Sequence, residues 1–241
     1  MTARSYRSVP FPCCPVHNAA MQAIVIGGTG AVGSSLVREL IASSRWEEII
    51  FLTRRASDLF RDVPKVRAVV VDLNDLQAQT AKAARGCQAA FNTMGVGQPS
   101  RTPKEEVWKV DVEYAGAFAR GCRTAGVEHI SLLSSVGANA SSRSFYIRVK
   151  GAAEEAVRAA GIRHTSLFRP SLLVTREIRY GLQDRLTQSI FPKVSRMLPA
   201  RFHPIRVEDL GRAMRLHAER SDGADVDVLQ YPEFQQLLEN A

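Results

Sequence analysis

The stretch MQAIVIGGTGAVGSSLVRE, residues 21–39, constrains the fold of this chain more than any other. It opens with a short, β-branched apolar run at residues 22–26, which is typical of a buried strand. A glycine turn follows, and apolar side chains then recur at helical spacing through residues 32–41. In the order strand, glycine turn and helix, a G-x-x-G-x-x-G spacing indicates a dinucleotide-binding site. The alternative is a tight turn of the same shape that binds no ligand.

The three glycines of the motif have different expected roles. Gly27 permits the tight turn, Gly30 lets the backbone approach a pyrophosphate, and Gly33 lets the helix pack closely on the strand. The helix N-terminus adds unpaired N–H groups and the positive end of the helix dipole. The predicted contacts with the cofactor in this turn are Gly27, Thr29, Gly30, Ala31, Val32 and Gly33.

The loop after the second strand is expected to select the cofactor. This strand is expected at residues 48–53, and Arg54 and Arg55 follow it directly. An acidic residue in this loop would bind the ribose 2′-hydroxyl of NAD. Guanidinium groups pair with a phosphate instead, so the sequence predicts NADP(H), bound by Arg54 and Arg55. The alternative is that both arginines are solvated on an exposed loop.

Two further strands are expected at residues 65–71 and 87–93. Ligands of open parallel sheets bind beyond the carboxyl ends of the strands, so residues at these ends extend the predicted cofactor site. They are Asp72, Leu73, Thr93, Met94 and Gly95. Asp72 is predicted either to accept a hydrogen bond from the adenine amino group or to cap a helix at residues 74–85.

The second half of the chain carries side chains suited to proton transfer. Residues 102–105, TPKE, are typical of a capping box before a helix that Gly126 ends. A fifth strand at residues 127–135 ends in two serines, and Tyr146 and Lys150 lie four residues apart on one helix face. Tyr146 would give or take a proton, Lys150 would stabilise the phenolate, and Ser135 would donate to a substrate carbonyl. The alternative is a surface pair, or a core tyrosine beside a lysine that reaches for solvent.

The glycine motif, the Ser-Ser strand end and Y-x-x-x-K, in this order, resemble the short-chain dehydrogenase/reductase superfamily. Three longer stretches are similar to an atypical branch, that of the HIV-Tat-interacting oxidoreductase-like protein. They are WKVDVEYAGAFARGCRTAGVEHISLLSSVGA, SFYIRVKGAAEEAV and SLFRPSLLV. The resemblance covers residues 21–240, which is nearly the whole chain beyond its N-terminal tail.

The resemblance implies NADP(H) as cofactor and Ser135, Tyr146 and Lys150 as catalytic-type residues, with Ser134 as the second choice for the serine. It also places Pro170, after a sixth strand at residues 165–168, near the nicotinamide. Many superfamily members have an asparagine near Asp111 that serves a proton relay, and this role is not transferred to an aspartate. The implied activity is oxidoreduction of a small carbonyl or alcohol. Members of the branch are also described as regulators that bind proteins, so an NADP(H)-binding regulatory protein is the alternative.

Strand and helix patterns alternate along the chain, as a doubly wound parallel sheet requires. We therefore expect an α/β fold of the Rossmann type in a single domain, residues 21–241, with a substrate-side cap around residues 171–206. A last strand at residues 226–229 is expected at the edge of the sheet.

Composition narrows the partners and the location. The 241 residues carry a formal net charge of +8, but the arginines are scattered and no nucleic-acid motif accompanies them, so no nucleic acid is expected as partner. No apolar run is long enough to span a membrane. The cysteines, at positions 13, 14, 87 and 122, have neither disulfide-framework nor metal-ligand spacing, so no metal site is predicted.

A reducing compartment follows from the cysteines, and the cytoplasm is the first expectation. Residues 1–20 contain no acid and several Arg and Ser residues, which is the composition of an organelle transit peptide. Mitochondrial targeting by these residues is therefore the alternative to a disordered extension. The sequence gives no information on the oligomeric state.

Overall fold

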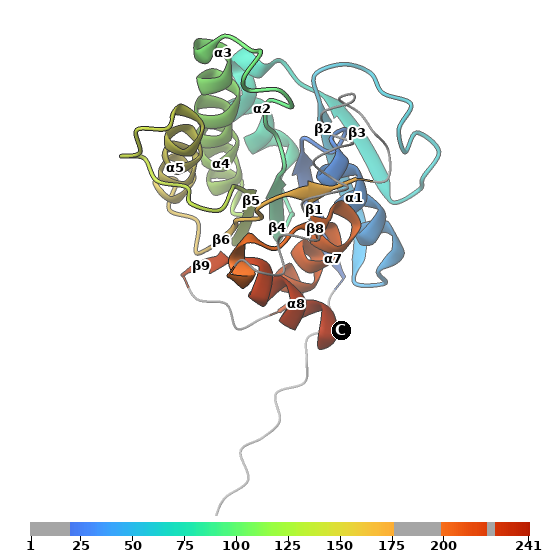
Figure 1. Ribbon diagram of the computed structural model, residues 1–241. Coiled ribbons are helices and arrows are strands. Elements are labelled where there is room, and N and C mark those ends of the chain that lie inside the picture. Colours follow the sequence, from blue (N-terminus) through green and yellow to red (C-terminus); the bar gives the residue numbers. More distant parts are fainter. Residues whose placement is uncertain (1–19, 176–198, 221–224) are drawn as a thin grey trace, which may run out of the picture.

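The computed structural model describes residues 20–175, 199–220 and 225–241 (Figure 1). Seven strands form one sheet in the order β3-β2-β1-β4-β5-β6-β9, and all neighbouring strands run parallel. The chain winds outward from β1 in both directions, so the strand order reverses between β1 and β4. The strands are β1 (Met21–Ile26), β2 (Trp46–Thr53), β3 (Val66–Val70), β4 (Ala89–Asn92), β5 (His129–Leu133), β6 (His164–Phe168) and β9 (Val226–Leu229). The predicted doubly wound parallel fold is confirmed, as is the strand at 226–229 at the sheet edge.

Helices cover both faces of the sheet (Figure 1). Strand β1 shows why both faces need cover: Ile24 and Ile26 pack into one core cluster, and Ala23 and Val25 pack into the other. A strand that is buried on both sides appears in sequence as a continuous apolar run, as residues 22–26 do. The first cluster lies under α2 (Leu76–Ala83), α4 (Tyr114–Ala125) and α5 (Phe145–Arg158), and the second lies under α1 (Ala31–Ala42), α7 (Val207–Ala218) and α8 (Tyr231–Glu239).

The helix expected between residue 104 and Gly126 is interrupted. It consists of α3 (Lys104–Trp108), a π-helical turn η2 (Lys109–Glu113) and α4. Such turns insert one extra residue into a helix, re-aim the side chains nearby, and are frequent at functional sites. The helix ends as expected at Gly126, whose φ is +85°. The predicted capping box is wrong, because Pro103 is the N-cap and the Thr102 hydroxyl donates to the carbonyl of Gln98.

The described part of the expected cap contains a second, two-stranded parallel sheet. It pairs β7 (Leu173–Val174) with β8 (Ile205–Arg206), and a 3₁₀ turn, η3 (Ala200–Phe202), precedes β8. Most of the cap, residues 176–198, lies outside the described residues, as do residues 1–19 of the N-terminal tail.

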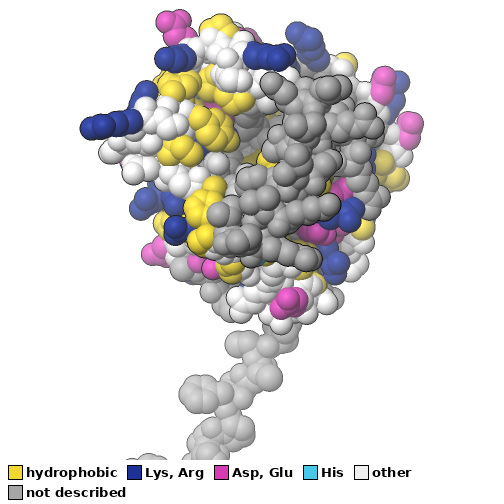
Figure 2. All heavy atoms as spheres, viewed as in Figure 1, with side chains coloured by type: hydrophobic (Ala, Val, Ile, Leu, Met, Phe, Trp, Pro, Cys, Tyr) yellow, Lys and Arg dark blue, Asp and Glu magenta, His cyan; other side chains and the backbone are white. Residues whose placement is uncertain are grey.

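The described residues contain no helix that is long and apolar enough to cross a membrane. On the face seen in Figure 2, the Lys and Arg side chains are spread out, with Asp and Glu side chains between them. Cys87 and Cys122 are free and buried. Burial raises the pKa of the Cys87 thiol to about 12, so this thiol is a packing group and a poor nucleophile.

Candidate active site

The glycine turn lies at the carboxyl end of β1, beside the end of β4. Gly27 has a φ of +81°, and a Cβ at this position would lie 2.4 Å from the backbone nitrogen of Met94. A Cβ on Gly33 would lie 2.4 Å from the Gly27 carbonyl oxygen and 2.5 Å from Thr93 Oγ1. Both glycines are therefore needed for the tight turn and for the close approach of α1, as the sequence predicts.

Gly30 differs from its two neighbours in the motif because the protein leaves space at it. A Cβ there would meet one atom within 4 Å, the Gly27 carbonyl oxygen at 3.2 Å. Gly30 is also the N-cap of α1, and because it has no side chain it cannot cap the N–H groups of the first turn. The first turn of α1 therefore offers N–H groups and the positive end of its dipole to a ligand, a combination that suits a pyrophosphate.

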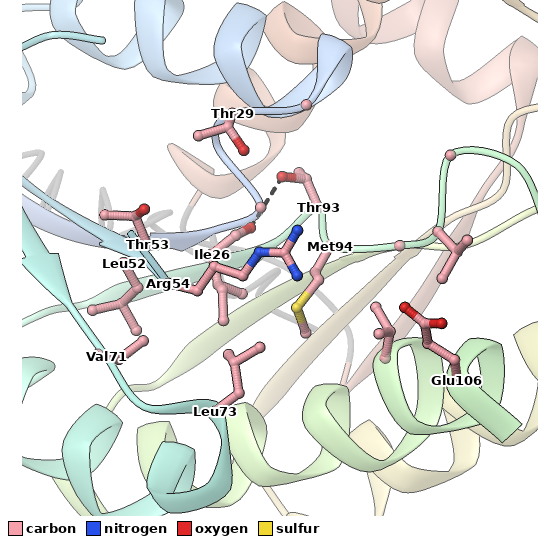
Figure 3. A pocket seen from close by; sticks show the side chains of 16 residues that line it. Ile26, Thr29, Leu52, Thr53, Arg54, Val71, Leu73, Thr93, Met94 and Glu106 are labelled. Atoms are coloured by element: carbon pink, nitrogen blue, oxygen red, sulfur yellow. Dashed lines mark hydrogen bonds between the residues drawn. The ribbon is translucent and has the colours of Figure 1, made fainter. Parts of the chain in front are cut away.

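A first cavity of about 340 Å³ opens at this turn, between β1, β2 and β4 (Figure 3). The Arg54 side chain extends from the end of β2 into it, and Glu106 lies on the side of α3 (Figure 3). The predicted cofactor residues that line it are Gly27, Thr29, Gly30, Arg54, Leu73, Thr93, Met94 and Gly95. Arg54 thus lines the cavity, whereas Arg55 is not among the described residues that do.

Asp72 also is not among the described residues that line this cavity. Its carboxylate accepts from the backbone N–H of Asn74 at 2.9 Å and caps a 3₁₀ turn, η1 (Leu73–Asp75). Capping, one of the two predicted roles, is therefore present, although it serves this short turn and not the helix α2 itself. The adenine contact remains a prediction.

A second cavity of about 440 Å³ joins the glycine turn to the predicted catalytic residues. It shares Gly30, Thr93, Met94, Gly95, Val96 and Gly97 with the first cavity. Ala31, Val32, Tyr146, Lys150 and Ser134 also line it, together with residues at the start of the expected cap. Ser135 is buried and, like Pro170 and Gly33, is not among the described residues that line it. The two cavities therefore meet at the glycine turn, and the second one extends from this turn to Tyr146.

Lys150 is buried and paired. Its Nζ lies 2.6 Å from Asp111 Oδ1, and Asp111 Oδ2 accepts from the backbone N–H of Val96 at 3.0 Å. Burial acts to lower the pKa of Lys150, but the charges of Asp111 and Tyr146 and the hydrogen bond to Asp111 outweigh it, so the net direction is upward. The ammonium Nζ lies 5.8 Å from the centre of the Tyr146 ring. Asp111 therefore fixes the lysine and the loop at Val96 together.

The turn η2 explains how Asp111 comes to face Lys150, because this turn packs against α5. Helix α5 in turn packs closely on the preceding loop: a Cβ on Gly151 would lie 2.1 Å from the backbone nitrogen of Ala140. Tyr146, near the start of this helix, keeps 39% of its surface exposed and opens onto the cavity. The site thus combines a fixed cation with an accessible phenol.

Sequence reasoning missed a second buried ion pair behind the cavity wall. The Glu154 carboxylate accepts hydrogen bonds from the Ser134 hydroxyl and from the Arg169 guanidinium. The available signal was position alone, because Glu154 lies one helical turn after Lys150 and Arg169 directly precedes Pro170. The described residues hold no group of His, Cys, Asp or Glu side chains that could bind a metal ion.

Comparison with known proteins agrees with this geometry. A family model described as NAD(P)H-binding matches residues 27–202. The protein FMP52, mitochondrial, of Debaryomyces hansenii is 29% identical over 228 residues, which cover 91% of this chain and 99% of that protein. FMP52, mitochondrial, of Saccharomyces cerevisiae is 25% identical over 210 residues, which cover 85% of this chain and 90% of that protein.

Solved structures share the fold. The oxidoreductase ylbE of Lactococcus lactis has a TM-score of 0.62 and 20% identity, covering 91% of this chain and 97% of that one. MoeE5 in complex with UDP-glucuronic acid and NAD has a TM-score of 0.68 and 22% identity, covering 88% of this chain and 76% of that one. The narrower resemblance to the Tat-interacting branch remains a prediction. The family model, together with the glycine turn and the hollow beside it, shows that the chain belongs to the NAD(P)H-binding family of Rossmann-fold proteins.

Proposed function

We propose that this protein is an NADP(H)-dependent oxidoreductase of the atypical short-chain type. It would transfer a hydride to or from a small carbonyl or alcohol, with Tyr146 as the acid or base. The observation that carries this proposal is the second cavity, which Tyr146 and Lys150 line together with the glycine turn. A proton-transfer group and a dinucleotide turn that share one hollow are what hydride transfer to a carbonyl requires.

Arg54 supports NADP(H) over NAD(H) as the cofactor. Its guanidinium lies in the first cavity, at the end of β2, where the ribose of the adenosine half is expected. A planar guanidinium binds a phosphate with two parallel hydrogen bonds, and a 2′-hydroxyl offers no such partner. MoeE5 was solved with NAD. The proposed preference for NADP(H) therefore rests on Arg54 and not on that structure.

The residues of the chain divide the chemistry between them. Bound NADP(H) would supply or accept the hydride. The Tyr146 hydroxyl would hold the proton that the substrate oxygen gains or loses, and the Lys150 ammonium would stabilise the phenolate when that proton has left. Asp111 keeps Lys150 in place. Ser134 lines the cavity, which favours it over Ser135 as the serine beside Tyr146.

The test is turnover by the Tyr146→Phe variant. Purified protein with NADPH is screened against a panel of small ketones and aldehydes, and the loss of nicotinamide absorbance is followed. We expect Tyr146→Phe to abolish turnover and to leave NADPH affinity unchanged. Tyr114→Phe, a variant outside both cavities, is the matched control. Unchanged turnover in Tyr146→Phe would remove the assignment.

The pairing of Lys150 favours a second candidate function. Asp111 offsets the charge that would otherwise act on Tyr146 alone, so the protein would bind NADP(H) as a sensing or structural ligand with little turnover. This candidate predicts tight NADPH binding without conversion of any compound in the panel. It also predicts that capture of a protein partner changes with NADPH and with Arg54→Ala, and capture indifferent to both would count against it.

We further propose a mitochondrial location. The relatives FMP52 are named mitochondrial proteins, and residues 1–20 have the acid-free, Arg- and Ser-containing composition of a transit peptide. Their names give no support to the cytoplasmic expectation. Fusing residues 1–20 to a fluorescent reporter tests the proposal, and a diffuse cytosolic signal would contradict it.

A further inference from the structure

A pair of opposite charges lies directly behind the cavity wall at Ser134. Glu154 is on α5, one helical turn after Lys150, and is only 5% exposed. Arg169 follows β6, and its side chain is 22% exposed. Buried carboxylates are rare unless they are paired and hydrogen-bonded, so each contact of Glu154 has to be accounted for.

The hydrogen bonds of Glu154 determine which of its neighbours are donors. Arg169 donates through Nε to Oε1 at 2.8 Å and through Nη2 to Oε2 at 2.5 Å. These bonds raise the pKa of the guanidinium above its usual value, and a carboxylate held in this way can only accept. Ser134 Oγ lies 2.5 Å from the same Oε1, so the serine must be the donor.

A serine hydroxyl has one proton and two lone pairs. Since Ser134 gives its proton to Glu154, it has only lone pairs left to offer to the cavity that it lines. A carbonyl oxygen has no proton to give to such a lone pair, whereas an alcohol has one. The polarity of this part of the wall is thus set from behind, by residues that do not touch the ligand.

We propose that Glu154, held by Arg169, is a positioning residue that makes Ser134 a hydrogen-bond acceptor and so selects the hydroxyl form of the ligand, an alcohol, at this point of the cavity. This inference rests on the proposed function and adds to it which form of the substrate, the alcohol, the site binds better. Protonated Tyr146 can donate to the oxygen of either form, so the alcohol, which accepts from Tyr146 and donates its one proton to Ser134, is the form that both side chains can bind; for oxidation this proton turns from Ser134 to the Tyr146 phenolate.

The substitution Glu154→Gln reverses this polarity at almost constant volume. Arg169 can only donate, and in the orientation that keeps the amide oxygen on its Nη2 the amide nitrogen takes the place of Oε1 and faces Ser134, while Arg169 Nε loses its acceptor. The amide nitrogen donates to the serine oxygen, which leaves the serine proton free to point into the cavity. Glu155→Gln is the matched control, because Glu155 is the next residue of the same helix and is exposed.

The kinetic test uses cyclohexanol with NADP⁺ and cyclohexanone with NADPH, an alcohol and the ketone that forms from it by loss of two hydrogens. Glu154→Gln should raise KM for the alcohol and lower KM for the ketone, each by about two- to tenfold, the range for one hydrogen bond gained or lost. Glu155→Gln should change neither. A purely structural role would move both KM values in the same direction or change kcat alone, and either result would overturn the proposal.

A second measurement does not depend on turnover. Neutron diffraction from deuterium-exchanged crystals locates the deuteron on Ser134 Oγ. We expect it to point at Glu154 in the native protein and into the cavity in Glu154→Gln. A deuteron that points into the cavity of the native protein would overturn the inference. If no compound of the ketone and aldehyde panel, nor either probe, is turned over but the deuteron points at Glu154, the oxidoreductase proposal fails and the positioning role of Glu154 stands.

Discussion

Replacing Gly33 by alanine should destabilise the protein although alanine favours helices. The new Cβ would lie 2.4 Å from the Gly27 carbonyl oxygen, 2.5 Å from Thr93 Oγ1 and 2.7 Å from the Gly28 Cα. The first and last of these atoms belong to the tight turn and cannot move aside as the end of a flexible side chain could. The substitution must therefore push α1 away from β1 and β4.

The size of the effect follows from two opposing contributions. Overpacking of this kind costs about 3 kcal/mol, at the upper end of the usual range because three atoms are crowded at once. Alanine regains about 1 kcal/mol relative to glycine inside a helix. The net loss is about 2 kcal/mol of unfolding free energy, which lowers the Tm of a chain of this length by about 4–8 °C.

Thermal and urea denaturation of Gly33→Ala measure this loss, and Gly30→Ala is the control. Gly30 has φ −73° and ψ 170°, which any residue adopts, and its Cβ would meet a single atom at 3.2 Å. Its stability should change by less than about 1 kcal/mol, while its affinity for NADPH should fall by about tenfold because the methyl group enters the cavity. A Gly33→Ala protein as stable as the native one would refute the packing role of this glycine.

Three further substitutions test the site and its surroundings. Arg54→Ala should weaken NADPH binding by about tenfold or more and leave NADH binding unchanged, whereas Arg55→Ala should affect neither; equal effects of the two variants in a fluorescence titration would contradict this. Asp111→Ala leaves the Lys150 ammonium buried without its carboxylate and should lower the unfolding free energy in urea by about 3 kcal/mol; a loss below about 1 kcal/mol would show that the pair is not needed. His129 has its pKa lowered from 6.5 to about 3, first by burial and then by His217. Between these two pKa values the unfolded chain binds a proton at His129 and the folded protein does not. The unfolding free energy should therefore fall by about 1.4 kcal/mol per pH unit from pH 6.5 toward pH 3. His129→Asn should flatten this slope between pH 6.5 and 5, and an unchanged slope would rule out His129 as its source.

Local patterns predicted the fold well because each carries its own physical cause. The run at residues 22–26 is apolar throughout since β1 is buried on both faces, and Gly27 and Gly33 stand where any Cβ would collide with the backbone. The π turn η2 could not be foreseen, because one extra residue hardly changes the helical spacing of the apolar positions. Its consequence, a buried Asp111 beside Lys150, was therefore invisible in the sequence.

The candidate site also has parts that the sequence predicts and parts that it does not. Tyr146 and Lys150 share a helix face, so their spacing alone predicts their proximity. Ser134 and Ser135 are adjacent at a strand end, and successive residues of a strand point to opposite faces, so a difference of one position decides which serine lines the cavity. Glu154 and Arg169 come from separate elements, and only the packing of α5 against the end of β6 brings them together.

The most direct test of the account is a titration of the purified protein with NADPH and, separately, with NADH, followed by nicotinamide fluorescence. The two adjoining cavities, with Arg54 in the first and Tyr146 in the second, predict tight binding of NADPH and much weaker binding of NADH. Equal affinities would contradict the phosphate role of Arg54, and no binding of either nucleotide would contradict the central claim that these cavities hold NADP(H).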